Sequence, residues 1–429
     1  MNQWGKVDQD DIVRARNVLL ASGRRTLREE VDAYRVLAQV SPAAYLPLLA
    51  RKLQHLGYAG SGTWHPSSLE LCEEAVEAAR RIDPAEPVRA DVLYQALRSC
   101  QRELYRRGRR TEGLALRAEM LAISRAQAER SGKPVAKGLS EWAAGLSEEG
   151  RYAEAADAMD ELVAALLPEG RSDGALAWSL MQWIAALHDA GRSGEARAAF
   201  ERFVAMEAAE AARRSGPVVC HLHALIGYAR MLDLHGRDDQ AARVRRDALA
   251  VLTELTERAA SGERVSWGGY EASFWAVLLT VSGTEGVGSW SDGPRTPSGT
   301  NPTEWSPDAR QRYFDSRDAL RREVDALAGR TAEDPAAHLA ELVRVQSVLT
   351  VRSAVYWENR THLFAEQVRP LFDEGVTLAR QLPRYDPAEG PRTLARTLIE
   401  RSAFRIAARE LGPALDDFRE ALSHLGEAG

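Results

Sequence analysis

The sequence predicts an all-α protein, an α-solenoid of about seven or eight stacked helical hairpins. Apolar residues recur at helical spacing along almost the whole chain, as at Leu139, Trp142, Ala143 and Leu146. Glycines and prolines fall between these segments, where helices stop and start. No stretch shows sustained alternation with β-branched residues, so we expect no β-sheet.

One turn sequence repeats four times and marks the junction between two helices. Each copy has a glycine followed by arginine, with a small residue five positions after the glycine; the glycines are Gly108, Gly150, Gly191 and Gly236. The intervals are 42, 41 and 45 residues. A glycine there takes the left-handed conformation that ends a helix, and the small residue lets two antiparallel helices approach closely. This repeat predicts helical hairpins stacked in sequence.

The residues around these turns resemble the tetratricopeptide repeat family over residues 90 to 255. Counted back from each glycine, the apolar positions of the family's first helix fall on Leu97, Leu104, Leu139, Trp142, Leu146, Leu180, Trp183, Leu187, Leu225, Tyr228 and Leu232. The large residue of the second helix matches at Met159 and Phe200, whereas Arg117 and Arg245 occupy it in the outer copies. The period is longer than the ~34 residues of the standard repeat.

Two flanking segments extend the resemblance beyond the central copies. Residues 33–50 look like repeats of large actinobacterial arrays, which carry an Asn pair where this chain has Gln54 and His55. Residues 412–422 resemble a final second helix. The resulting order is an N-terminal helical cap (1–40), tetratricopeptide-like repeats (41–282), a loop (283–307) and C-terminal hairpins that continue the solenoid (308–429). The loop contains Trp290 and Trp305, and docking on the solenoid and disorder remain alternatives for it.

Composition excludes several classes of protein. The 429 residues carry a formal net charge of −6 with a pI near 6.0, which argues against a globally basic nucleic-acid binder. The longest strongly apolar run, residues 274–281, is far shorter than the ~20 residues needed to cross a membrane. With no export signal and only 3 cysteines, a cytoplasmic protein with reduced thiols is expected.

Motifs for catalysis or cofactors are missing from the sequence, so an enzyme is the less favoured hypothesis and no cofactor or metal is expected. Cys220 and His223 share one helical face, and His188 is the candidate third ligand, but a metal site needs three or four. The alternative is a buried cysteine with surface histidines. The polar segment 358–362 is a second candidate, most simply a structural network.

A basic stripe is the first candidate binding site. Arg98, Arg102 and Arg106 recur every four residues and so lie on one helical face, with Tyr105 beside them and Lys137 at the start of the next first helix. The family resemblance implies that Arg98 and Arg102 face the concave groove, where they resemble a carboxylate clamp for the acidic end of a peptide. Arginine suits this role because its planar fork makes paired hydrogen bonds to a carboxylate. The alternative is a solvated arginine-rich face.

Further along, the groove positions become partly apolar. They are Trp178, Met181, Gln182, His188, Asp189, His223, Ile226, Arg230 and Asp233. We take Trp178, Met181, His188 and Arg230 as candidates for contacting an extended or helical peptide. The alternative for Trp178 and Met181 is packing against a neighbouring helix.

The leading hypothesis is therefore a non-enzymatic scaffold that binds a protein or peptide segment in a concave groove. A regulatory or sensor module for a separately encoded ATPase or transcription factor is one alternative; an enzyme built on a helical solenoid is another. Nucleic acid and membranes are not expected as partners.

Overall fold

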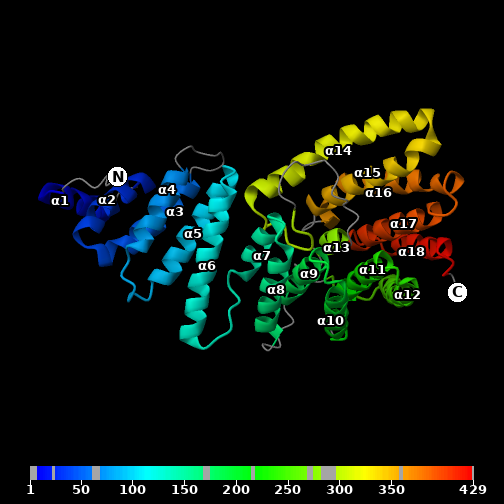
Figure 1. Cartoon of the computed structure of the whole chain (residues 1–429), viewed down its shortest axis with the longest axis horizontal. Helices are drawn as coiled ribbons and strands as arrows, with labels where there is room; N and C mark the ends of the chain where they lie inside the picture. The colour runs from blue at the N-terminus through cyan, green and yellow to red at the C-terminus, as the bar shows by residue number, and fades with distance from the viewer. Residues whose placement is uncertain are drawn as a thin grey trace. The chain divides into compact units, whose positions relative to one another are not determined.

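The computed structural model describes residues 7–21, 25–59, 68–167, 174–213, 218–267, 274–281, 296–356 and 361–427. Within these ranges the chain is an all-α solenoid, with 18 α-helices and no strand, as the sequence predicts (Figure 1). The chain divides into two compact units: unit 1 is Met1–Gly145 with Ser306–Asp308, and unit 2 is Leu146–Trp305 with Ala309–Gly429. Each unit has its own packing and is described by itself.

Unit 1 is a sequential stack of helices. Its members are α1 (Gln9–Leu20), α2 (Leu27–Val40), α3 (Pro42–Ala59), α4 (Ser68–Arg80), α5 (Arg89–Arg106), α6 (Arg110–Ser131) and the first part of α7 (Leu139–Glu148). From α1 to α6, each helix packs against the next, and α3 also packs against α5. Leu49, Ala75 and Leu97 belong to the core that these contacts bury. Packing of each element on its sequence neighbours is the pattern of a repeat protein.

The repeated turn has the conformation that the sequence predicts. Gly108, Gly150, Gly191 and Gly236 all have positive φ, between 64° and 75°. In each copy the amide N–H of the following arginine donates to the carbonyl five residues earlier, at 2.9 Å. The same bond joins Glu410 N–H to the Arg405 carbonyl at 2.8 Å, where Arg409 occupies the left-handed position with φ 68°. A fifth hairpin therefore closes with the same geometry, without glycine.

Unit 2 begins as a continuation of this pattern. Its helices are the end of α7, α8 (Tyr152–Leu166), α9 (Gly174–Asp189), α10 (Ser193–Ala211), α11 (Val218–Leu234), α12 (Asp238–Ala260), α13 (Trp275–Val281), α14 (Pro307–Glu333, from Ala309), α15 (Pro335–Tyr356), α16 (Thr361–Ala379), α17 (Gly390–Ala407) and α18 (Leu411–His424). Neighbours from α8 to α12 and from α15 to α18 pack in order.

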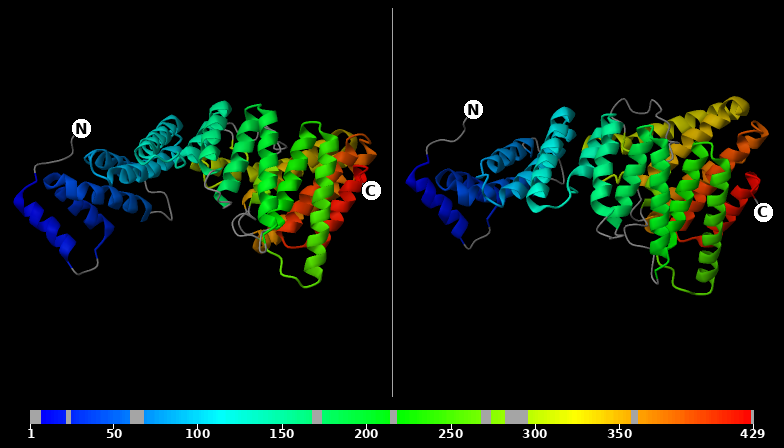
Figure 2. Two further views of the ribbon diagram at one scale, coloured as in Figure 1. Left: turned by 90° about the horizontal axis from the view of Figure 1, so that it is seen from below. Right: turned by 60° about the horizontal axis from the view of Figure 1, so that its bottom comes forward.

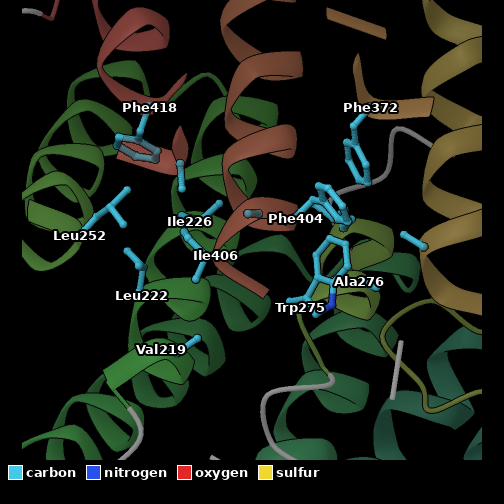
Figure 3. Packing of buried hydrophobic residues seen from close by; sticks show 14 of the residues in the cluster. Val219, Leu222, Ile226, Leu252, Trp275, Ala276, Phe372, Phe404, Ile406 and Phe418 are labelled. Atoms are coloured by element: carbon cyan, nitrogen blue, oxygen red, sulfur yellow. The ribbon is translucent and has the colours of Figure 1, made fainter. Parts of the chain in front are cut away.

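The C-terminal hairpin of unit 2 also folds back on an earlier one. Helix α17 packs against α11 and α18 packs against α12, while α13 contacts α9, α11, α15 and α17. Figures 1 and 2 show the C-terminal helices beside the green α11 and α12. In a strictly linear repeat stack, each unit touches only its sequence neighbours. Here the apolar faces of two distant hairpins cover each other, and Figure 3 shows the resulting core around Trp275, Phe404 and Phe418.

The described end of the long loop is packed on unit 2. Trp305 is buried, with its ring 5.0 Å from that of Tyr313 and 6.1 Å from that of Phe314, measured between centroids. The Gly299 N–H donates to Thr280 Oγ1 at 3.2 Å. Of the two tryptophans, Trp305 therefore docks on the helices, whereas Trp290 lies outside the described residues.

Candidate functional site

The predicted basic stripe lies on α5 in unit 1. Arg98, Arg102 and Arg106 are all exposed. The Arg98 guanidinium lies 3.6 Å from a Glu141 carboxylate oxygen, and Arg106 pairs with Glu103. Three cations are thus presented on one helix face, and acidic side chains lie close to Arg98 and Arg106.

Lys137 and Tyr105 occupy different environments. The Lys137 ammonium lies 3.8 Å from an Asp91 carboxylate oxygen and 3.9 Å from the centroid of the Tyr94 ring. Tyr105 is fully buried, beneath the guanidinium groups of Arg110 and Arg117. Its ring lies in the space left by Gly113, where a Cβ atom would come within 2.8 Å of it. The ring of Tyr105 is therefore part of the α5–α6 interface and offers no surface to a ligand.

A hollow of about 260 Å³ lies beside the stripe, between α3 and α5. Its lining residues are Arg51, Gln54, His55, Asp91, Val92 and Gln95. Gln95 is one helical turn before Arg98, so the hollow and the stripe share the α5 surface. The carbonyl and amino groups of the two glutamines can accept from and donate to a peptide backbone. Unit 1 thus combines hydrogen-bonding side chains with nearby arginines.

The four remaining candidates lie in unit 2 and do not form one cluster. Trp178 and His188 are half-buried on α9, and Met181 on the same helix is fully buried. The ring centroids of His188 and His235 lie 5.4 Å apart. The pKa of His188 is lowered mainly by burial and, to a smaller extent, by the charge of His235. Arg230 on α11 lines a cavity that none of these three α9 side chains reaches.

That cavity lies in the described part of unit 2 and has a volume of about 320 Å³. Its walls come from α11, α13 and α17, together with parts of α12 and α18 and the residues that follow α18. Apolar side chains form much of the lining; they include Ile226, Trp275, Leu278, Leu279, Ala403 and Phe418. Figure 3 shows Ile226, Trp275 and Phe418 on three different helices around this region.

The two arginines that are buried in the cavity wall are paired with carboxylates. Arg230 Nη1 lies 2.9 Å from Glu400 Oε1, and the other oxygen of Glu400 accepts from Ser347 Oγ at 3.2 Å. Arg245 is held between Asp233, at 2.6 Å, and Glu427, to which its Nε donates at 2.8 Å. Burial raises the pKa of Asp233, and the hydrogen bond from Arg245 opposes that rise. Each buried arginine of the wall is therefore paired with at least one carboxylate.

His223 is an uncharged polar residue of the wall, and one of its ring nitrogens lacks a hydrogen bond within the described ranges. It is 2% exposed, and its Nε2 atom has no hydrogen-bond partner among the residues that the structure describes. Its ring packs against Trp275, with 6.3 Å between centroids. Desolvation by burial lowers the pKa of His223 to about 3, so the imidazole is neutral at physiological pH.

One side of this cavity comes from α11 and the opposite side from α17. His223, Ile226, Arg230 and Asp233 were expected on a groove, and all four line the cavity. The opposing residues of α17 were not singled out. Arg392, Arg396 and Glu400 recur every four residues and so lie on one helical face. The same spacing of charged residues that indicated a candidate site on α5 is therefore present on α17.

The metal and enzyme alternatives gain no support from side-chain geometry. Among the described residues, no three His, Cys, Asp or Glu side chains converge as metal ligands, and Cys220 is buried. Burial raises the pKa of the Cys72 and Cys100 thiols to about 12, which keeps both protonated and unreactive. Glu358, Asn359 and Arg360 of the polar segment 358–362 lie outside the described residues. None of the helices in the described ranges has the length and apolarity to cross a bilayer.

Comparisons with known proteins provide no family for the chain. No protein-family model and no curated protein matches it. One of the solved structures that matches is described as a circular tandem repeat protein with novel repeat topology and enhanced subunit contact surfaces. It shares 15% sequence identity, covers 98% of this chain and 96% of its own, and superposes with a TM-score of 0.18. No argument about function rests on this similarity.

Proposed function

We propose that this protein is a non-enzymatic interaction scaffold of the tetratricopeptide type. The bound partner is an extended peptide segment that lies on the α3–α5 face of unit 1 and carries an acidic side chain or a C-terminal carboxylate. The observation that supports this best is the hollow lined by Gln54 and Gln95, with the exposed Arg98 one turn away.

The chemistry of this face suits a peptide better than a rigid small molecule. A peptide in extended conformation presents unpaired N–H and C=O groups, which the glutamine amides can satisfy. A peptide carboxylate would then meet Arg98 and Arg102, since arginine binds carboxylates through two parallel hydrogen bonds.

Competition from the protein's own acids is weak at Arg98. Its separation of 3.6 Å from Glu141 is longer than the ~2.7–2.9 Å of a charge-assisted hydrogen bond. The Arg98 side chain is 45% exposed, and exposed ion pairs of this kind contribute only about 0–1 kcal/mol. A ligand carboxylate can therefore replace Glu141 at little cost.

The test is capture of partners by the wild type beside the Arg98→Glu/Arg102→Glu variant, followed by titration of the captured partner's acidic peptide. We expect the double variant to lose the partner and to weaken peptide binding by about tenfold or more. Replacing a C-terminal carboxylate by its amide should weaken wild-type binding similarly. Circular dichroism and the melting temperature should not change.

The matched control is Arg243→Glu/Arg246→Glu, which makes the same charge change on exposed arginines of α12. It should retain the partner. If the α5 variant captures the same proteins as the wild type with the same peptide affinity, the clamp is wrong and binding occurs elsewhere.

A further inference from the structure

We propose that the cavity of unit 2 binds a small, uncharged amphipathic molecule, whose apolar or aromatic body contacts Trp275 and whose single polar group hydrogen bonds to His223. This site goes beyond the proposed peptide face, because all of its lining residues belong to unit 2.

The size of the cavity is the first argument. Protein interiors are close-packed and seldom leave voids larger than a water molecule. At about 320 Å³ the cavity is at the lower end of the ~300–1,000 Å³ that is typical of small-molecule sites. It also lies where the C-terminal hairpin meets α11, at a junction of elements distant in sequence.

The charges of the wall determine the class of ligand. Arg230 is paired with Glu400, and Arg245 is paired with Asp233 and Glu427. A buried ion on the ligand would lack a free counter-ion among these groups, and an unpaired buried charge is strongly unfavourable. At the exposed rim, the charges of Arg392 and Arg396 are balanced by those of Asp238 and Glu389, so the rim selects neither anions nor cations. An uncharged molecule is the consistent occupant.

His223 supplies the polar contact. Buried polar groups are almost always hydrogen-bonded, and an exception calls for an explanation such as a ligand. His223, whose Nε2 is unpartnered among the described residues, lines the same cavity as the apolar residues Trp275 and Ile226, and its ring packs against that of Trp275. A hydroxyl, amide or aromatic N–H on the ligand would satisfy it, while the ligand's apolar part would cover Trp275.

The test uses two fluorescent probes that share the same ring skeleton and differ in charge. N-phenyl-1-naphthylamine is uncharged and carries one N–H donor, whereas 8-anilino-1-naphthalenesulfonate adds a sulfonate anion. We expect the uncharged probe to bind the full-length chain saturably, with one probe per chain. The anionic probe should bind at least about tenfold more weakly, because its charge lacks a partner in the wall.

Variants then locate the uncharged probe. His223→Phe keeps a ring in the wall but removes the nitrogen, and should weaken binding about three- to tenfold. Ala229→Leu places extra methyl groups in the cavity and should abolish saturable binding without lowering the melting temperature. Ala403→Val fills the same space from α17 and replaces Ala229→Leu if that variant unfolds. The control is His338→Phe, a histidine on α15 outside the cavity, which should bind as the wild type does.

Three results would overturn the proposal. The first is binding of the uncharged probe that does not saturate, or that survives both cavity-filling variants in folded protein. The second is equal loss of affinity in His223→Phe and His338→Phe. The third is tighter binding of the anionic probe, which would assign the cavity to organic acids. None of these results bears on the peptide face, because no peptide is present in the assay.

Discussion

Arg230 of α11 and Glu400 of α17 form an ion pair, 2.9 Å between Nη1 and Oε1, with side chains only 8% and 5% exposed. The two residues belong to hairpins far apart in the sequence, and both line the cavity of unit 2. Burying two charges costs desolvation energy that their attraction offsets only when both remain in place. We therefore expect the pair to help fix the register of the C-terminal hairpin on α11.

Replacing one member of this pair should lower the free energy of unfolding much more than replacing both members. We expect Glu400→Gln, which leaves the Arg230 charge buried, to lower the free energy of unfolding by about 3–5 kcal/mol. The double variant Arg230→Met/Glu400→Leu should recover most of this loss. Urea unfolding monitored by circular dichroism measures both effects.

A surface pair provides the control. Arg344 and Glu341 lie 2.6 Å apart with both side chains more than 40% exposed, so Glu341→Gln should cost less than about 1 kcal/mol. A double variant at Arg230 and Glu400 that is as unstable as Glu400→Gln alone would contradict the buried-pair explanation.

Acidification should destabilise the fold through His223. The unfolded chain protonates this histidine below its ordinary pKa of 6.5, whereas the folded chain keeps it neutral down to about pH 3. Unfolding therefore takes up a proton in this window, and stability falls as the pH is lowered through it. Between pH 7 and pH 5 the wild type should lose about 2 kcal/mol more than His223→Phe does. Urea unfolding at both pH values measures the difference, and parallel losses in the two proteins would refute it.

Docking of residues 296–305 can be tested at Gly299. Its φ is +64°, and a Cβ atom there would lie 2.6 Å from Ala185 Cβ and 2.7 Å from the Met181 carbonyl oxygen. Gly299→Ala should therefore cost about 2 kcal/mol or more, since neither contact can move without displacing α9. Gly194→Ala, in the open first turn of α10, should be neutral or stabilising by up to about 1 kcal/mol. A neutral Gly299→Ala in thermal unfolding would mean that the segment does not dock on α9.

Sequence reasoning succeeded where the interactions are local. Periodicity at three and four residues predicted the helices, and the glycines of the repeated turn predicted their ends. It was less informative about individual side chains. Tyr105 precedes Arg106 by one residue, which is about 100° around a helix, and this rotation carries it from the exposed stripe into the α5–α6 interface.

The sequence by itself determined that this chain is an all-α solenoid. That follows from backbone preferences and helical spacing within a few turns. Only the tertiary structure decided that α17 supplies the opposite wall, that Arg230 meets Glu400, and that Nε2 of His223 is left without a hydrogen bond among the described residues. These facts depend on which apolar faces cover one another across long stretches of chain, and that choice is made by the packing of the whole unit.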